Sequence, residues 1–229
     1  KKFGLEYELF LSTKPEKYVG TDGQWSDAEN QLRQALEAHR LPHKVKEGDG
    51  AFYGPKIDIT VVDALKRRHQ CATIQLDFQL PERFNLTYST PESVTGSFKR
   101  PVIIHRAVFG SVERFMAILM EHTAGKWPLW LSPRQCAIVP VSKDQFGYAE
   151  TIRAQLQAAG LIADADLSDN TLSKKIRENQ LAQYNYILVV GRAEEKDQTV
   201  NVRSRTNEIL RVEGLNDFIH RTKLEIQDY

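Results

Sequence analysis

Residues 57–78, with the sequence IDITVVDALKRRHQCATIQLDF, decide the fold of the first half of this chain. Apolar and polar residues alternate in two runs, 57–61 and 73–78. A period of two places apolar side chains on one face of a strand and polar side chains on the other. Because a sheet with one polar face is typical of antiparallel pairing, we predict two half-buried strands of an antiparallel sheet.

The flanking residues predict more strands and two helices around this sheet. Residues 7–11 indicate a strand, and the apolar run 101–104 indicates a buried strand that ends at His105. A first helix is expected to use Asp22 as its cap. Its inward face would consist of Trp25, Ala28, Leu32, Ala35 and Leu36, and a second helix would bury Val112, Phe115, Met116 and Leu119. With a polar excursion at 87–98, this half has an α+β pattern with an antiparallel sheet.

A different pattern begins after residues 125–133, where two prolines and a glycine end the preceding helix. We therefore place the domain limits at 1–130 and 131–229. Expected strands at 136–141, 161–165 and 186–191 alternate with expected helices at 146–159 and 172–183. This order predicts a small α/β domain with a largely parallel sheet and helices on both faces. A hairpin over 198–203 and 208–212 and a closing helix complete it.

The composition excludes several classes of protein. The formal charge is +1, from 31 basic and 30 acidic residues, so any nucleic acid would have to be held by local clusters. Cys71 and Cys136 fit neither a disulfide framework nor a zinc ladder, and we expect buried thiols. No run approaches the roughly twenty apolar residues of a membrane span, so we expect no membrane partner.

Polar residues gather at two places that could bind a small ligand. Residues 48–56, GDGAFYGPK, combine three glycines with Tyr53 and Lys56, and such a segment either lets backbone approach a ligand or is an ordinary tight turn. On the strand 73–78, Thr73 and Gln75 with the nearby Gln70 could read a polar substrate. The alternative is a solvent-exposed face.

The junction between His105 and Arg114 is a further candidate. A strand end followed by a helix start can aim an imidazole and a guanidinium at one small volume. His105 could bind a metal ion or simply make a hydrogen bond, and zinc needs three protein ligands. Arg114 could clamp a phosphate or lie on the surface.

Basic residues of the second half form two clusters, Lys174, Lys175 and Arg177 on a helix and Arg203 and Arg205 on a strand. They could hold a single-stranded RNA loop, with Glu194 accepting from a base edge. The alternative is a solvated helix face.

Five segments carry a resemblance to a known family. They are GAFYGPKIDI (50–59), HQCATIQLDFQLP (69–81), RPVIIHRAVFGSVERF (100–115), GKWPLWLSPRQ (125–135) and LAQYNYILVVG (181–191). Together they resemble the class II threonyl-tRNA synthetases, and their sequences are closer to eukaryotic than to bacterial members. The stretch HRAVFGSVERF resembles the third class II motif of that family.

The resemblance implies an antiparallel catalytic sheet that forms threonyl-adenylate from threonine and magnesium-bound ATP and then charges tRNA(Thr). It implies these roles: Arg114 and Lys56 as catalytic residues, Gln70, Ser111 and Arg114 for ATP, and Tyr53, Thr73 and Gln75 for threonine. His105 would be a zinc ligand. In this family zinc takes the amino group and the hydroxyl of threonine, so valine leaves a coordination position unfilled, whereas serine still fits.

The second half resembles the family's anticodon-binding domain, which implies base-reading roles for Arg177, Glu194 and Arg203. Gln183 stands where bacterial members place an arginine. The first two class II motifs and the other zinc ligands do not occur here. We therefore expect a C-terminal part of a longer homodimeric enzyme of the cytoplasm or mitochondrial matrix, inactive by itself.

Two alternatives remain open from the sequence. A non-catalytic tRNA-binding paralogue would also lack the upstream motifs, although it would not need Tyr53, Gln75, His105 and Arg114. A different class II synthetase with a similar anticodon domain would carry no zinc at His105.

Overall fold

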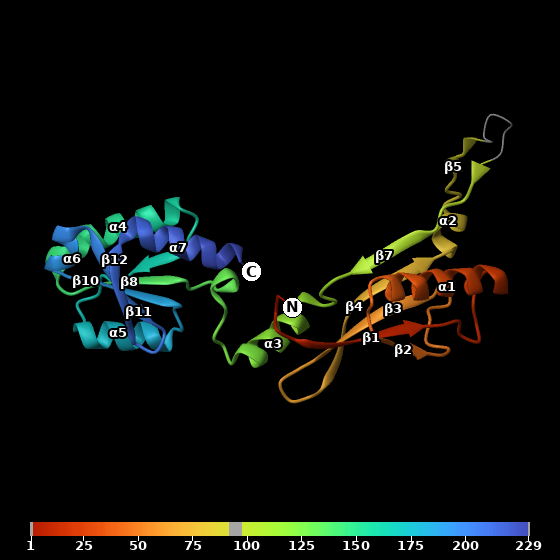
Figure 1. Ribbon diagram of the computed structural model, residues 1–229, viewed down its shortest axis with the longest axis horizontal. Coiled ribbons are helices and arrows are strands. Elements are labelled where there is room, and N and C mark those ends of the chain that lie inside the picture. The colour runs from red at the N-terminus through yellow and green to blue at the C-terminus, as the bar shows by residue number, and fades with distance from the viewer. Residues whose placement is uncertain (1, 92–97, 229) are drawn as a thin grey trace. The chain divides into compact units, whose positions relative to one another are not determined.

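The computed structural model describes residues 2–91 and 98–228 (Figure 1). The chain divides into two compact units, Lys1–His122 and Thr123–Tyr229. The limits 1–130 and 131–229 inferred from the sequence stay a prediction. In the described part of the chain, no helix combines the length and the apolar character that a membrane crossing requires.

The first unit is built on a five-stranded sheet. Its strands are β1 (Glu6–Ser12), β2 (His43–Lys46), β3 (Lys56–Val62), β4 (Arg68–Asp77) and β7 (Ile103–Ala107), in the order β2-β1-β3-β4-β7. The pairs β1–β3, β3–β4 and β4–β7 are antiparallel, and β1–β2 is parallel. The predicted α+β fold with an antiparallel sheet is therefore confirmed, with one parallel pair at its edge.

Helix α1 (Asp22–Ala38) covers one face of this sheet (Figure 1). Leu32 and Leu36 pack with Leu9, Leu11 and Ile57 in the core of the unit. The expected cap at Asp22 was wrong, because the Thr21 hydroxyl accepts from the backbone N–H of Gln24 and completes a capping box. Ala35 is exposed rather than inward.

Two burial predictions near His105 were wrong. Among the described residues strand β7 pairs with β4 alone and forms an edge of the sheet, so Ile104 is 63% exposed instead of buried. Helix α3 (Val112–Thr123) buries Phe115, Ile118 and Leu119 and leaves Val112 and Met116 exposed. The Phe115 ring meets the Phe3 ring edge-to-face at 5.0 Å and packs at a tilt against the Phe109 ring at 4.8 Å, and these contacts favour the face of α3 that turns inward.

Short elements complete both units. They are α2 (Gln79–Arg83), β5 (Tyr88–Ser89) and β6 (Phe98–Lys99) in the first unit, and the 3-10 turns η2 (Leu129–Leu131) and η3 (Lys143–Gln145) in the second. The ends of the predicted polar excursion pair as β5 and β6, and its residues 92–97 lie outside the described residues.

The second unit is a mixed five-stranded sheet between helices. Its strands are β8 (Cys136–Pro140), β9 (Ala163–Ala165), β10 (Tyr186–Val190), β11 (Thr199–Ser204) and β12 (Ile209–Gly214), in the order β12-β11-β10-β8-β9. Strands β10, β8 and β9 are parallel, while the predicted hairpin joins the same sheet as antiparallel β11 and β12. Its helices are α4 (Phe146–Ala158), α5 (Leu172–Leu181), α6 (Arg192–Asp197) and α7 (Leu215–Gln227).

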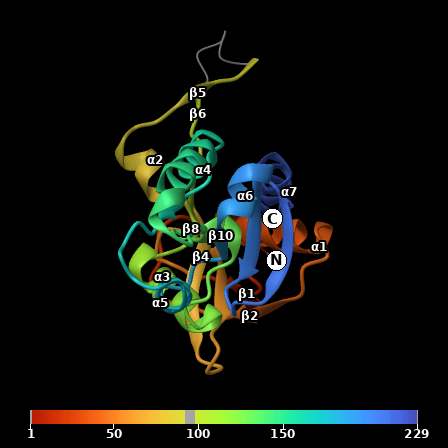
Figure 2. The same cartoon turned by 90° about the vertical axis from the view of Figure 1, so that its left-hand side faces the viewer.

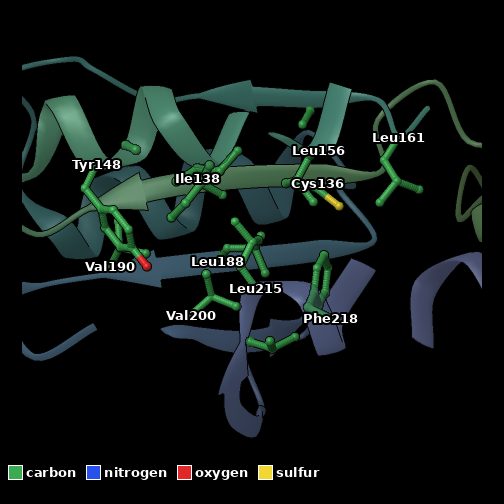
Figure 3. Close-up of a cluster of buried hydrophobic side chains, with 14 residues drawn as sticks. Cys136, Ile138, Tyr148, Leu156, Leu161, Leu188, Val190, Val200, Leu215 and Phe218 are labelled. Carbon is green, nitrogen blue, oxygen red and sulfur yellow. The ribbon is translucent and has the colours of Figure 1, made fainter. Parts of the chain in front are cut away.

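Apolar cores on both faces hold this second sheet. Figure 3 shows Ile138, Leu188 and Val200 of the sheet packed with side chains of α4 and α7, such as Leu156 and Phe218. On the other face Ile176 of α5 packs against the sheet, and Figures 1 and 2 show α5 opposite α4 and α7. Both cysteines are free and buried, as predicted.

Candidate functional site

The strand register places three candidate residues in one row across the first sheet. Lys56 of β3 lies opposite Gln75 of β4, and Gln75 lies opposite His105 of β7. Their neighbours along the strands, Ile57 and Ile74, pack with the core beneath α1, so the row lies on the other face. Adjacent strands are about 4.8 Å apart, so the row spans roughly 10 Å, the length of a small substrate.

A β-bulge brings Gln70 onto the same face. The register shifts between Ile59 and Thr60, so that Thr60 pairs with Gln70 and Cys71 is the extra residue. A regular period of two from Gln75 through Thr73 would have placed Cys71, not Gln70, beside the row. The bulge therefore places Gln70 on the same face as the row. There the Gln70 Nε2 donates to the Asp58 Oδ1 at 2.8 Å.

Lys56 is held by carboxylates at the start of β3. Its Nζ lies 2.9 Å from the Asp58 Oδ2 and 3.7 Å from the Asp49 Oδ2. The Asp58 side chain is 2% exposed and that of Lys56 is 17% exposed. The Ser12 Oγ lies 3.2 Å from the Asp58 Oδ2. Asp58 thus links Lys56 and Gln70, and sequence reasoning missed this carboxylate because it counted only as a polar position in the alternation.

The loop before β3 is fixed against β4 by its backbone. The N–H of Leu76 donates to the carbonyl of Pro55 at 3.1 Å, and that of Phe78 donates to the carbonyl of Tyr53 at 2.9 Å. A Cβ on Gly54 would lie 2.0 Å from the carbonyl oxygen of Leu76. Glycine is therefore required for this close approach, which holds the Tyr53 backbone at the end of β4.

Thr73 and Gln75, two of the candidate threonine-binding residues, differ in the hydrogen-bonding groups that remain free for a ligand. The Thr73 hydroxyl donates its hydrogen to the carbonyl of Ile57 at 3.3 Å, so its oxygen remains only as an acceptor. The Gln75 Nε2 is buried and has no hydrogen-bond partner in the described part of the chain. An unpaired buried donor is unusual and favours a ligand or water beside it.

His105 lies in the middle of β7 and contacts a buried carboxylate. Its Nε2 lies 2.8 Å from the Oδ2 of Asp77, while the other oxygen of Asp77 accepts from the backbone N–H groups of Gln79 and Leu80. Burial of Asp77 would raise its pKa, but the bonds from Leu80, His105 and Gln79 outweigh burial and lower it. The imidazole is therefore anchored at one nitrogen, and its side chain is 43% exposed.

The structure offers one possible metal ligand here. Among residues 2–91 and 98–228, no three His, Cys, Asp or Glu side chains are grouped to hold an ion. An imidazole with one nitrogen bonded to a carboxylate is the usual form of a histidine metal ligand. His105 fits as a single ligand, and the set of three that zinc needs is not present in this part of the chain.

Ser111 and Arg114 lie at the start of α3. The Ser111 hydroxyl donates to the Glu113 carboxylate at 2.8 Å and accepts from the backbone N–H of Arg114 at 3.3 Å. Arg114 is exposed, and its guanidinium makes no hydrogen bond or ion pair to another described residue. This charge is available to an anion.

In the second unit a pocket of about 690 Å³ lies at the C-terminal end of α5. It is lined by Lys126, Arg177, Gln180, Leu181, Gln183, Ser204, Arg205 and Thr206. The Oε1 of Gln183 and the Nε of Arg205 are buried without partners among the described residues. The Arg205 Nη2 donates to the carbonyl of Trp127 at 2.8 Å, which fixes the guanidinium at the pocket. Gln183 itself follows the end of α5 rather than lying in the helix.

The three predicted base-reading residues do not share this pocket. Arg177 lines the pocket. Arg203 lies on β11 and does not line it, and its Nη1 donates to the Oδ1 of Asn207 at 3.0 Å. Glu194 caps α6 by accepting from the backbone N–H of Gly191, at the opposite end of β10. Five strand residues separate the two ends, roughly 16 Å, so the three residues line a surface rather than one pocket.

Lys175 does not belong to this surface. It is 3% exposed, and its Nζ lies 5.1 Å from the centre of the Phe146 ring. The helix face that the sequence indicated as solvated or RNA-binding is therefore reduced to Lys174 and Arg177.

Two family descriptions match this chain. Residues 2–123 match "tRNA synthetase class II core domain (G, H, P, S and T)", and residues 135–220 match "Anticodon binding domain". The chain therefore belongs to the class II aminoacyl-tRNA synthetases.

Similar proteins indicate which class II synthetases this chain resembles. The chain is 53% identical to "Threonine--tRNA ligase, mitochondrial 1" of Arabidopsis thaliana, with 100% of the chain and 32% of that protein covered. It is also 53% identical to "Threonine--tRNA ligase, cytoplasmic" of Saccharomyces cerevisiae, with 93% and 29% covered. The chain thus spans about a third of these relatives. The expected segment of a threonyl-tRNA synthetase is confirmed, and the two names include both of the expected compartments.

A solved structure agrees with this assignment. The "RNA binding domain of Threonyl-tRNA synthetase from Cryptosporidium parvum Iowa II" superposes with a TM-score of 0.91 at 48% identity. The match covers 98% of this chain and 56% of that one.

Proposed function

We propose that the protein containing this chain is a threonine–tRNA ligase, which joins threonine to ATP as threonyl-adenylate and then transfers the threonyl group to tRNA(Thr). The observation that carries this proposal is the row Lys56–Gln75–His105 on the open face of a class II core. Magnesium-bound ATP is the second substrate, and a homodimer is the expected assembly.

Threonine would lie over the row, beside Tyr53 and Thr73. The Thr73 oxygen can only accept, which suits the ammonium of an amino acid. The unpaired amide hydrogens of Gln75 suit the substrate carbonyl or carboxylate oxygens. These two groups together would orient the amino acid along the sheet.

ATP would contact Arg114, Ser111 and Gln70. The exposed guanidinium of Arg114 can bind phosphate oxygens in a bidentate manner. Because Gln70 donates to Asp58, its Oε1 is left to accept from a hydroxyl or amino group of the nucleotide. Lys56 would lie next to the carboxylate and phosphate that react.

His105 would serve threonine selection as a zinc ligand. With Nε2–H donated to Asp77, the lone pair of Nδ1 is the one available to a metal ion. Bound zinc would act as a Lewis acid that also takes the threonine amino group and hydroxyl, and valine has no hydroxyl to offer. The remaining ligands would come from parts of the protein other than the described residues.

The anticodon of tRNA(Thr) would lie along α5 and β11 of the second unit. Arg177, Arg203 and Glu194 would contact successive bases along a surface, consistent with their separation. Arg205 and Gln183 add an unpaired donor and an unpaired acceptor at one end of this surface.

The test separates the two units in the whole protein. Wild-type enzyme should show threonine-dependent ATP–pyrophosphate exchange and should charge tRNA(Thr). Arg177→Ala and Arg203→Ala should weaken charging by at least about tenfold and leave exchange unchanged, because they contact only tRNA. Arg153→Ala, a half-buried arginine of α4 that pairs with Glu150, is the matched control.

Two results would contradict the proposal. A protein that binds tRNA but shows no exchange with any amino acid would be a non-catalytic paralogue. Equal loss of exchange and charging in Arg177→Ala and Arg203→Ala would show that the second unit does not read the anticodon.

A further inference from the structure

Asp58 is a buried carboxylate beneath two side chains of the candidate active site. Its Oδ2 lies 2.9 Å from the Lys56 Nζ, and its Oδ1 accepts from the Gln70 Nε2 at 2.8 Å. The Ser12 Oγ, from a third strand, lies 3.2 Å from Oδ2. One carboxylate therefore joins groups from β1, β3 and β4.

Stability alone does not explain a carboxylate at this position. Burying a charge costs free energy, and a buried ion pair is often no more stabilising than apolar residues of the same volume. Asp58 is 1% exposed, yet Lys56 and Gln70 reach from it to the open face of the sheet. The arrangement is better explained by a need to fix the two side chains.

We propose that Asp58 is a positioning residue for amino-acid activation, which holds the Lys56 ammonium and the Gln70 amide at a fixed separation on the substrate face. This inference rests on the proposed ligase function. Because the Gln70 Nε2 donates to Asp58, its Oε1 is left as an acceptor for a substrate. Lys56 directs one N–H group at Asp58 and lies 3.7 Å from the Asp49 carboxylate, which leaves at least one N–H group for substrate oxygens.

The ion pair also defines what Lys56 contributes. Two carboxylates, Asp58 at 2.9 Å and Asp49 at 3.7 Å, offset the positive charge of Lys56, so the lysine acts as an oriented donor rather than as an isolated positive charge. Its effect on the reaction then depends on position, and a displacement of about 1 Å at a reacting group can lower a rate by about 100-fold.

The experiment measures threonine-dependent ATP–pyrophosphate exchange in the full-length enzyme. Asp58→Asn, which keeps the shape and removes the charge, should lower kcat/KM by about 100-fold. Glu8→Gln is the matched control, because Glu8 also pairs with two basic residues, Lys44 and Arg68, but touches no candidate site residue. It should stay within about threefold of wild type.

A double variant separates positioning from folding. Lys56→Met with Asp58→Asn removes both charges, so no unpaired charge is left buried. If Asp58 acts through Lys56 and Gln70, the double variant should be less active than Lys56→Met only by the share that Gln70 contributes, far less than the loss caused by Asp58→Asn alone. This comparison also holds if Asp58→Asn by itself fails to fold, which thermal unfolding would reveal.

Three outcomes are decisive. Exchange in Asp58→Asn within about threefold of wild type overturns the proposal. A double variant whose loss is the product of the two single losses overturns it as well. Wild-type enzyme without threonine-dependent exchange would instead refute the ligase function on which the inference rests.

Discussion

Replacing Gly54 with alanine tests whether the loop before β3 is part of the active site. The new Cβ would lie 2.0 Å from the carbonyl oxygen of Leu76, and contacts under 3.0 Å essentially never occur. The loop or β4 must therefore move by at least 1.0 Å, the difference between these distances. This movement would separate Tyr53 and Lys56 from Gln75.

The expected magnitude follows from the contacts that are disturbed. Overpacking costs about 1–3 kcal/mol, and the two weakened backbone hydrogen bonds of Tyr53 and Pro55 cost about 1 kcal/mol each. The unfolding midpoint should fall by roughly 10 °C. A displacement of this size should lower kcat/KM for threonine-dependent exchange by about 100-fold.

The assay combines thermal unfolding with ATP–pyrophosphate exchange in the whole enzyme. Gly147→Ala in α4 is the matched control, because its Cβ would meet no atom within 4 Å, and we expect a gain of up to about 1 kcal/mol. Unchanged unfolding and unchanged exchange in Gly54→Ala would refute the reasoning.

Three further predictions concern other groups. Burial raises the pKa of Cys136 to about 12, so native protein should resist iodoacetamide at this residue and react once unfolded; native labelling would contradict its burial. The pKa of Asp77 lies below its ordinary 3.8, so its stabilisation is present above that pH and is lost as the pH falls further. In Asp77→Asn the free energy of unfolding should fall less steeply in acid than it does in wild type. An equally steep fall in both proteins would contradict this prediction. Arg205→Ala should weaken tRNA binding in filter assays without changing amino-acid activation, and unaltered affinity would exclude the α5 pocket from the RNA surface.

Hydrophobic periodicity was sufficient for most strands of both units, because burial of one face enforces alternation. It missed β2, which has three exposed residues out of four and therefore no alternation to detect. It could not give sheet order, since pairing partners are distant in the sequence. For that reason Ile104 was expected to be buried although β7 is an edge strand. In α3, apolar residues occur on several sides, and the contact of Phe115 with Phe3 decides which side is inward.

The candidate site was also predictable only in part from the sequence. The candidate substrate-binding residues were named from the resemblance, but the carboxylates that hold them in place were not. Asp58 and Asp77 occupy ordinary polar positions of the alternation, and only the coordinates show that they hold Lys56 and His105. The bulge at Cys71, which decides where Gln70 lies, depends on pairing with β3 and leaves no periodic signal.

The most direct test of the central claim is the metal content and amino-acid selectivity of the full-length enzyme with His105→Ala. Wild type and the control His220→Ala should hold about one zinc ion per chain and activate threonine far better than valine. His105→Ala should lose zinc, and its preference for threonine over valine should fall by at least about 100-fold. A His105→Ala enzyme that keeps both its zinc and its selectivity would contradict the account.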